Sequence, residues 1–301
     1  MVRSAEVTHR TLVTGATGFV GSHLVRRLVG LGHEVSVIVR PSSDLERLGE
    51  TRSAISVYEH DGTTQGMIEI VQAASPDTAY HLASLYISEH NSADVSRLIG
   101  ANVEFAVQLM EALVAAAVPT CINTGTSWQF ARDGQYAPVN LYAATKQACE
   151  DLFTFYTSAH ALKVLTLALF DTYGPGDPRK KLLRLLWDSA TTGHPLLLSP
   201  GRQRIDLVYI DDVIDAFVLA ADVARAQTVP QSRYAVSSGA PIALADLVGA
   251  FAQATGMTVN ASLGARPYRA REVMVPWDTG RVLPGWTPRV SLAEGILKSK
   301  P

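Results

Sequence analysis

The sequence predicts an α/β fold, a doubly wound parallel sheet with a smaller, interleaved C-terminal lobe. Up to Phe170, short apolar runs bounded by turn residues alternate with longer segments of helical periodicity. A glycine-rich turn, TGATGFVG, separates the first such run from the first helical segment, and the alternation becomes irregular after Phe170. Repeated strand–helix alternation implies parallel strands joined by right-handed crossovers, with helices on both faces of the sheet.

The individual elements follow in order along the chain. Strands are expected at 9–15, 34–40, 54–60, 77–83, 119–125 and 163–170. Helices are expected at 18–32, 64–74, 95–117 and in the segment that contains Tyr142. The turn-rich run DTYGPGDP then begins the second lobe, with short strand-like pieces at 204–210, 234–238 and 258–263. Residues 211–224 are interpreted as a helix that returns to the main domain.

Composition argues against several classes of protein. The chain has 301 residues, 47% of them hydrophobic, and a net charge of −2 with mixed signs, so no basic face points to nucleic acid or an anionic membrane. The longest apolar runs are too short to span a bilayer and the N-terminal MVRSAEVTHR lacks a secretory apolar segment, so we expect a cytoplasmic protein. Cys121 and Cys149 have no CxxC spacing. We interpret them as packing thiols, with a reactive thiol as the alternative, and expect no metal site.

The turn TGATGFVG places Gly15, Gly18 and Gly21 between a strand and a helix. Glycine is needed where the chain turns tightly and where backbone approaches a pyrophosphate, and a helix N-terminus offers amide donors to phosphate. With a second strand near residue 37, the pattern predicts a Rossmann-type dinucleotide site. We therefore assign residues 1–173 to a dinucleotide-binding domain, completed by about 205–224, and residues 174–301 mainly to a substrate-binding lobe.

Arg40 ends the second strand and is followed by Pro41, Ser42 and Ser43, where an acidic residue is expected for the adenosine ribose of NAD. A carboxylate there repels a 2′-phosphate, whereas an arginine with nearby hydroxyl groups can bind it. NADP(H) is therefore preferred to NAD(H) as the cofactor. A solvated arginine at a strand end is the alternative interpretation.

The stretch NLYAATKQACE, residues 140–150, puts Tyr142 and Lys146 four positions apart in a run of helix formers. Residues at this spacing share a helix face, and a nearby positive charge favours the phenolate form of tyrosine. An exposed helix with an unrelated tyrosine and lysine is the alternative. The dinucleotide site ahead of the pair favours a catalytic role.

The succession TGATGFVG, HLA, NTGTS, YAATK, RIDLVYIDDV and GWTPRVSLAEGI resembles the extended short-chain dehydrogenase/reductase family, in its branch of nucleotide-sugar epimerases, dehydratases and reductases. The resemblance covers the chain from Thr11 to Ile296. Within it, NTGTSWQ and NLYAATKQACE are most similar to NDP-4-keto-6-deoxyhexose 4-ketoreductases, including CDP-abequose-synthase-like enzymes.

The resemblance implies that Tyr142 and Lys146 are catalytic and that a hydroxyl after the fifth strand assists them. Aligning VPTCINTGTSWQFA with the family pattern places Thr126 at this hydroxyl position. Thr124 is the competing choice, because the first hydroxyl of the family's pair is replaced by Gly125.

The resemblance also implies cofactor-facing positions along the first domain. Besides the catalytic pair they are Gly15, Thr17, Gly18, Phe19, Val20, Gly21, Arg40, Ser43, Asp61, Gly62, Leu82, Ala83 and Asn102. Asp61 is expected near the adenine, and Asn102 is expected to have a structural or cofactor-facing role on the long helix. We expect His81 to be packed and hydrogen-bonded and not to act as an acid or base.

For the sugar nucleotide, Arg204 and Arg269 match family positions that contact the diphosphate. Guanidinium groups bind phosphate oxygens in forks and stay charged at any working pH. Lys181 is interpreted as part of a solvated helix start, with phosphate contact as the alternative. Ser127 and Trp128 are expected at the sugar, although a packing role suits Trp128 nearly as well.

Ser127 and Trp128 occupy the positions where dehydratases of the family carry Asp-Glu, which disfavours dehydration. The predicted function is NADPH-dependent reduction of the C4 keto group of a nucleotide-linked 4-keto-6-deoxyhexose, linked to dTDP or CDP. The alternatives are an NDP-sugar 4-epimerase with tightly bound NAD and a non-catalytic NADP-sensing regulator on the same fold. A homodimer would suit the family; nucleic acid and membrane are not expected as partners.

Overall fold

The computed structural model describes residues 9–301, which form two compact units. The first unit takes in residues up to Gly125, together with Leu141–Leu167 and Ile214–Tyr234. The second takes in Thr126–Asn140, Ala168–Val213 and Ala235–Pro301. Residues 1–8, which make up most of the run from which we expect no secretory signal, lie outside the described part of the chain.

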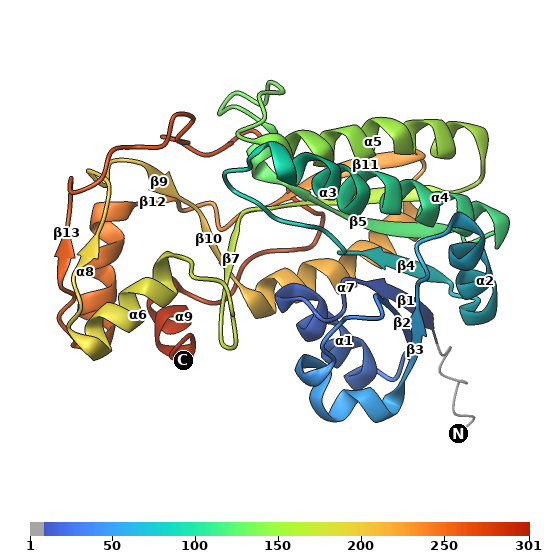
Figure 1. Ribbon diagram of the computed structural model, residues 1–301, viewed down its shortest axis with the longest axis horizontal. Helices are drawn as coiled ribbons and strands as arrows, with labels where there is room; N and C mark the ends of the chain where they lie inside the picture. The colour runs from blue at the N-terminus through green and yellow to red at the C-terminus, as the bar shows by residue number, and fades with distance from the viewer. Residues whose placement is uncertain (1–8) are drawn as a thin grey trace. The chain divides into compact units, whose positions relative to one another are not determined.

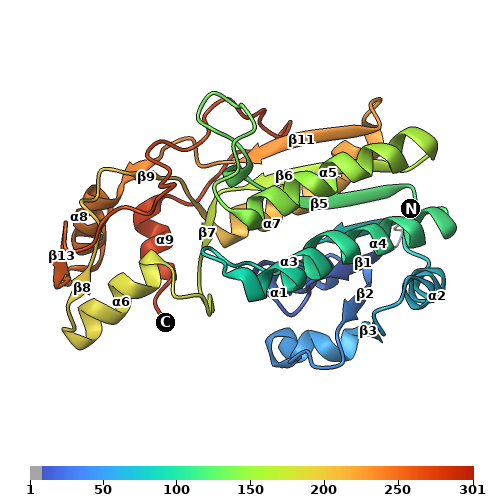
Figure 2. The same ribbon diagram turned by 45° about the horizontal axis from the view of Figure 1, so that its top comes forward.

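A seven-stranded sheet is the centre of the fold, with the strand order β11-β6-β5-β4-β1-β2-β3 (Figures 1 and 2). Its strands are β1 (Arg10–Thr14), β2 (Glu34–Val39), β3 (Ile55–Glu59), β4 (Thr78–His81), β5 (Thr120–Thr126), β6 (Lys163–Leu169) and β11 (Gln231–Val236). The pairs β1–β2, β2–β3, β1–β4 and β4–β5 are parallel, with Val13 opposite both Val37 and Tyr80. The predicted doubly wound sheet is confirmed. The strand order reverses between β1 and β4, the place where such sheets bind their ligands.

Helices cover both faces of this sheet. They are α1 (Phe19–Gly30), α2 (Thr64–Ala74), α3 (Val95–Ile99), α4 (Phe105–Ala115), α5 (Leu141–Ala159) and α7 (Ile210–Ala226), with 3₁₀ turns η1 (Glu46–Ala54) and η2 (Ser92–Asp94). Figures 1 and 2 show α2, α4 and α5 on one face and α1 and α7 on the other. The expected helix at 95–117 is confirmed as a continuous helical run, and a π turn, η3 (Gly100–Glu104), lies within it between α3 and α4.

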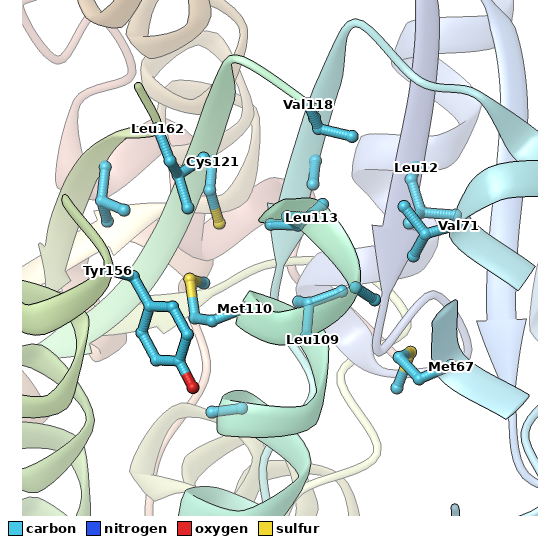
Figure 3. Packing of buried hydrophobic residues seen from close by; sticks show 14 of the residues in the cluster. Leu12, Met67, Val71, Leu109, Met110, Leu113, Val118, Cys121, Tyr156 and Leu162 are labelled. Atoms are coloured by element: carbon cyan, nitrogen blue, oxygen red, sulfur yellow. The ribbon is translucent and has the colours of Figure 1, made fainter. Parts of the chain in front are cut away.

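The main core lies between the sheet and α2, α4 and α5 (Figure 3). Leu109, Met110 and Leu113 of α4 are fully buried there, against Leu12 of β1 and Cys121 of β5. The 24-residue run Ser92–Ala115 contains an 18-residue window with a mean hydropathy of 1.4, so it is long and apolar enough to cross a membrane by length and composition alone. Because α4 contributes Leu109, Met110 and Leu113 to this core, we interpret the run as a core helix whose first turns, with Val95 and Ile99, are exposed.

The second unit consists of short elements. They are η4 (Ser127–Gln129), β7 (Asp171–Tyr173), α6 (Leu182–Thr192), β8 (Leu196–Leu197), β9 (Arg204–Ile205), β10 (Leu207–Tyr209), β12 (Ile242–Ala243), α8 (Leu244–Thr255), β13 (Ala261–Ser262) and α9 (Leu292–Lys298). The strands form three two-stranded sheets, β10-β7, β12-β9 and β13-β8. The ring of Trp187 on α6 packs edge-on against Phe251 on α8, with 5.0 Å between centroids.

Two expected strands of the smaller lobe are corrected. The strand at 204–210 is divided at Asp206, whose buried carboxylate accepts hydrogen bonds from the hydroxyl of Ser237 (2.5 Å) and the amide of Ser238 (2.8 Å). The strand at 234–238 is the end of β11 and belongs to the main sheet, next to β6. Its apolar side chains are buried in this position, which favours the sheet over a separate lobe strand.

Candidate functional site

Gly15 follows β1 at the point where the strand order reverses. Its φ is +71°, and a Cβ atom there would lie 2.6 Å from the amide nitrogen of Ala83, in the loop after β4. The amide of Gly18 donates to the Gly15 carbonyl at 3.0 Å, and a Cβ atom at Gly21 would overlap that same carbonyl. Only glycine therefore fits at positions 15 and 21. Gly18, the N-cap of α1, has no side chain to cap the helix, so the first amides of α1 can face an anion.

Thr14, the last residue of β1, joins this turn to the loop after β4. Its hydroxyl oxygen accepts the amides of Leu82 and Ala83, both at 3.2 Å, and lies 2.9 Å from Nδ1 of His81. With both lone pairs used, the hydroxyl donates its own proton to His81. Burial, and secondly the charge of Lys146, lower the pKa of His81 to about 3. His81 is therefore a neutral, packed histidine, as the sequence predicts.

Asn102 lies in the π turn and is 2% exposed. Its Oδ1 accepts the amide of Leu85 (2.7 Å) and the hydroxyl of Ser84 (3.3 Å), and its Nδ2 donates to the Leu85 carbonyl and to Oγ1 of Thr145, both at 3.0 Å. These four bonds use the amide's full capacity, so none is left for a cofactor. Asn102 acts structurally, because it holds the loop after β4 against α5.

The residues expected near the adenosine lie after β2 and β3. The backbone amide of Arg40 donates to the hydroxyl of Ser43 at 3.0 Å, which closes a tight turn. The Arg40 guanidinium is exposed and has no ion pair among residues 9–301. The carboxylate of Asp61 accepts hydrogen bonds from the amide and the hydroxyl of Thr63, each at 2.8 Å. These hydrogen bonds lower the pKa of Asp61. The structure therefore offers a cation for an anionic group at the end of β2.

The other expected cofactor residues lie in the same loops. Thr17 and Val20 are half-buried at the start of α1, where the Phe19 ring is buried and meets the ring of His23 edge-on. Gly62 has a φ of +90°, and its carbonyl accepts the side-chain amide of Gln108 at 3.0 Å.

Tyr142 and Lys146 lie one turn apart at the start of α5, as their spacing predicts. The Nζ atom of Lys146 is 5.9 Å from the centroid of the Tyr142 ring. Lys146 is only 3% exposed, and burial lowers its pKa. Tyr142 is half-buried, and the ring of Tyr86 meets it edge-on at 5.1 Å. A buried ammonium group beside an accessible phenol is suited to proton exchange.

The two candidate hydroxyls lie two residues apart on β5 and therefore on the same face of the strand. Thr126 accepts the amide of Trp128 at 3.3 Å, and its own amide donates to Oε1 of Gln129 at 2.9 Å, which forms a capping box for η4. The Thr124 hydroxyl is buried without a hydrogen-bond partner among the described residues. Either hydroxyl still has a proton to donate, and the choice between them stays a prediction.

The residues expected at the sugar nucleotide lie in the second unit. In η4, Ser127 is buried and Trp128 is half-buried. Lys181 is the N-cap of α6, in keeping with the expected helix start, and its ammonium group pairs with Asp171 at 2.9 Å.

Arg204 and Arg269 are both exposed. The amide of Arg204 donates to the carbonyl of Met274 at 3.0 Å, so β9 lies beside the segment that follows Arg269. The guanidinium of Arg204 donates to the carbonyl of Pro241.

An ion pair that the sequence did not predict lies behind the Tyr142–Lys146 pair. Glu150 of α5 pairs with Arg233 of β11, with 2.6 Å between Oε2 and Nη2. The signal was present in NLYAATKQACE, because Glu150 follows Lys146 by one helical turn. The partner strand was not recognisable, since 83 positions separate the two residues.

Both cysteines are buried, in keeping with packing thiols. Burial raises the pKa of Cys121 to about 12 and that of Cys149 to about 11, so neither favours the reactive thiolate. Across residues 9–301, no group of three His, Cys, Asp or Glu side chains could hold a metal ion.

These features define a doubly wound α/β protein with a glycine turn shaped for a dinucleotide and a Tyr–Lys pair suited to proton transfer. The chain belongs to the NAD dependent epimerase/dehydratase family, which matches residues 11–236. The resemblance to nucleotide-sugar enzymes of the extended short-chain dehydrogenase/reductase type is thereby confirmed.

Several characterised relatives are similar over most of their length. The UDP-glucose 4-epimerase of Mycolicibacterium smegmatis is 29% identical over 96% of this chain and 97% of its own. The CDP-abequose synthase of Yersinia pseudotuberculosis is 26% identical over 89% of this chain and 91% of its own. The dTDP-glucose 4,6-dehydratase of Streptomyces griseus is 25% identical over 96% and 92%. Their names describe different reactions of nucleotide sugars.

Solved structures share the fold. MoeE5, in complex with UDP-glucuronic acid and NAD, has a TM-score of 0.81 and 25% identity, over 96% of this chain and 97% of its own. The UDP-glucose-4-epimerase of Stenotrophomonas maltophila, with bound NAD and formylated UDP-arabinopyranose, has a TM-score of 0.86 and 20% identity over 97% of both chains.

Proposed function

We propose that this protein reduces the C4 keto group of a nucleotide-linked 4-keto-6-deoxyhexose with NADPH. The observation that carries the proposal is the pair on α5, where the buried Nζ of Lys146 lies 5.9 Å from the ring centroid of the half-buried Tyr142. Family membership supports a nucleotide sugar as the substrate class. Similarity to CDP-abequose synthases of Yersinia pseudotuberculosis and Salmonella typhimurium supports the ketoreductase branch.

The first unit has the shape that a dinucleotide requires. Gly15 and Gly21 leave room for close backbone approach, and the uncapped start of α1 would face the pyrophosphate. Arg40 and Ser43 would hold the 2′-phosphate of NADPH, because a guanidinium with a neighbouring hydroxyl group binds phosphate oxygens well. The bound nicotinamide supplies the hydride.

The pair on α5 handles the proton. Tyr142 gives its phenolic proton to the oxygen of the keto group as that oxygen gains negative charge. Lys146 stabilises the resulting phenolate and holds the nicotinamide ribose. Thr126 donates a hydrogen bond to the reacting oxygen, with Thr124 as the competing choice.

Two arginines of the second unit bind the substrate in this proposal. The exposed guanidinium groups of Arg204 and Arg269 would pair with the diphosphate of the sugar nucleotide. Ser127 and Trp128 lie directly after Thr126 in η4 and would face the sugar. Neither side chain is a carboxylate that could expel water, and this supports reduction over dehydration.

A second candidate function is NDP-sugar 4-epimerase. The 29% identity to the UDP-glucose 4-epimerase of M. smegmatis favours it, and the complex of MoeE5 with NAD shows that a similar protein binds the unphosphorylated cofactor. Arg40, which has no ion pair among residues 9–301, stands in place of an acidic residue, and this favours NADPH and therefore the reductase. Tightly bound NAD in the purified protein would instead favour the epimerase.

The test is to mix the protein with NADPH and a panel of dTDP- and CDP-linked 4-keto-6-deoxyhexoses. Loss of NADPH absorbance at 340 nm is followed, and the products are identified by mass spectrometry and NMR. The proposal expects stoichiometric formation of a 4-hydroxy sugar with NADPH consumption. Interconversion of NDP-4-hydroxy sugars without net cofactor consumption would overturn it in favour of the epimerase.

A further inference from the structure

Glu150 is a buried acid directly behind the proposed catalytic pair. Its side chain is 3% exposed, and Oε2 lies 2.6 Å from Nη2 and 2.7 Å from Nε of Arg233 on β11. The Arg233 guanidinium also donates a hydrogen bond to Oε1 of Gln147, at 3.2 Å. Acidic side chains are rarely buried to this degree unless they are paired. Burial of this carboxylate costs desolvation free energy, which its pairing with Arg233 offsets.

The position of Glu150 on α5 gives it a second neighbour besides Arg233. Tyr142, Lys146 and Glu150 succeed one another at intervals of four residues and therefore lie on one face of the helix. Lys146 lies between the phenol and the carboxylate, and it is 3% exposed. Burial leaves the ammonium group little contact with water, so a carboxylate one turn along the same helix face can stabilise its charge through space, although no ion pair joins the two side chains among the described residues.

We propose that Glu150, anchored by Arg233, is a positioning residue that keeps the buried ammonium group of Lys146 charged beside Tyr142. The proposal rests on the proposed function, in which Lys146 must be positive to stabilise the phenolate. Glu150 thereby joins Tyr142 and Lys146 on one face of α5, and it acts on the substrate only through Lys146.

Other groups around Lys146 act in opposite directions. His81, facing from β4, is neutral; were it charged, it would repel the ammonium group. Burial lowers the pKa of Lys146, and Cys149 and Glu150, on α5 itself, partly offset this by raising it. Cys149 is a thiol whose own pKa is raised to about 11, so Glu150 is the carboxylate among them. Arg233 faces Glu150 from β11 and is partly exposed to solvent.

The direct test is to measure the titration of Lys146 in the whole protein by NMR, with lysine labelled with ¹³C at Cε. The sequence has few lysines, which simplifies assignment: Lys146, Lys163, Lys180, Lys181, Lys298 and Lys300. Lys146→Met identifies the Lys146 signal. In Glu150→Gln, which keeps the shape and an acceptor for Arg233, the pKa of Lys146 should fall. This readout needs neither cofactor nor substrate.

Glu111→Gln is the matched control. Glu111 accepts a 2.7 Å hydrogen bond from the hydroxyl of Tyr156, also on α5, so its substitution removes a carboxylate that contacts the same helix. The pKa of Lys146 should not change in this variant. An unchanged pKa in Glu150→Gln, or an equal fall in both variants, would overturn the proposal.

Glu150→Gln removes the carboxylate that pairs with the Arg233 guanidinium, and this loss could prevent folding. A second variant is used for that outcome. Glu150→Gln/Arg233→Gln replaces the ion pair with two neutral amides, and such exchanges are often tolerated. The pKa of Lys146 should still fall, since Glu150 raises it and Arg233 has no comparable effect on it. An unchanged or raised pKa in the double variant would show that the ion pair only fastens β11 to α5.

Activity supplies a separate readout. With the substrate found in the panel above, kcat of Glu150→Gln should fall on the order of tenfold, the usual scale for groups that support a functional side chain. The loss should grow as the pH rises, because Lys146 then loses its proton earlier than in the wild type. If no panel substrate is turned over, the NMR result still decides the role of Glu150, and only the proposed function fails.

Discussion

Thr14 and His81 are joined by a 2.9 Å hydrogen bond at the place where β1 and β4 end. The same Thr14 hydroxyl accepts the amides of Leu82 and Ala83, so one side chain sets the shape of the loop opposite Gly15. This arrangement requires a neutral His81, since a proton on Nδ1 would face a hydroxyl whose acceptor capacity is already used. Through Thr14, the glycine turn and the histidine of HLA therefore belong to one hydrogen-bonded unit.

The first prediction concerns pH. The pKa of His81 is about 3 in the folded protein against 6.5 for an ordinary histidine, so the unfolded chain binds a proton below pH 6.5 that the folded protein does not. Stability from this residue is present above pH 6.5 and is lost as the pH falls toward 3, on the order of 5 kcal/mol in total. Urea unfolding of His81→Gln should show a shallower loss of stability over this range. The exposed His160→Gln should keep the wild-type slope; an unchanged slope in His81→Gln would contradict the prediction.

Tyr142→Phe deletes only the hydroxyl group, so the ring should still pack against Tyr86, and fold and NADPH affinity should survive. Turnover should fall by about 100- to 10,000-fold, mainly in kcat, because the proton moves in the transition state. Tyr136→Phe, at an exposed tyrosine, serves as the control in the same NADPH assay. Near-normal turnover by Tyr142→Phe would mean that the proton comes from another group.

Lys146→Met should slow the reaction and also weaken NADPH binding, because the lysine is assigned both the phenolate and the ribose. Fluorescence titration with NADPH separates the two effects, since Tyr142→Phe should bind the cofactor normally. Equal NADPH affinity in Lys146→Met and Tyr142→Phe would show that Lys146 does not bind the nicotinamide ribose.

Arg40→Asp should shift cofactor preference from NADP(H) toward NAD(H). It replaces a cation that suits a 2′-phosphate with a carboxylate that suits a ribose hydroxyl. The measurement is the ratio of kcat/KM with NADPH to that with NADH. Arg26→Asp makes the same charge change on the exposed surface of α1 and should leave the ratio as it is. If Arg40→Asp also leaves the ratio of the two kcat/KM values unchanged, Arg40 does not bind the 2′-phosphate.

Arg204→Ala should weaken sugar-nucleotide binding by about 2 kcal/mol, or roughly 30-fold in Kd, the scale of one lost charge-assisted contact. NADPH binding should stay nearly intact, and calorimetry measures both. The neighbouring exposed Arg202→Ala is the control. Equal losses for the two ligands would indicate misfolding, and no loss for the sugar nucleotide would exclude Arg204 from its site.

The sequence by itself determined the features that depend on local geometry. Strand and helix periods, turn residues and the strand–helix alternation predicted the doubly wound sheet and the place of the glycine turn. The Tyr142–Lys146 relationship was also predictable, because four residues always make about one helical turn. Gly21 was recognisable because the carbonyl that excludes its Cβ atom belongs to Gly15 in the same turn, and Gly15 because its positive φ is part of that turn. The contact of Gly15 with Ala83, by contrast, is a tertiary one.

Only the tertiary structure decided which remote segments meet. Thr14 and His81 are 67 positions apart, and Glu150 and Arg233 are 83 apart. The π turn that holds Asn102 and the place of β11 beside β6 likewise follow from packing. Such contacts form because folding buries apolar surface and pairs polar groups from all parts of the chain. A local sequence pattern does not show which remote segments will meet in this way. For this reason the sequence showed the reacting face of α5, while the fold revealed the carboxylate and guanidinium behind it.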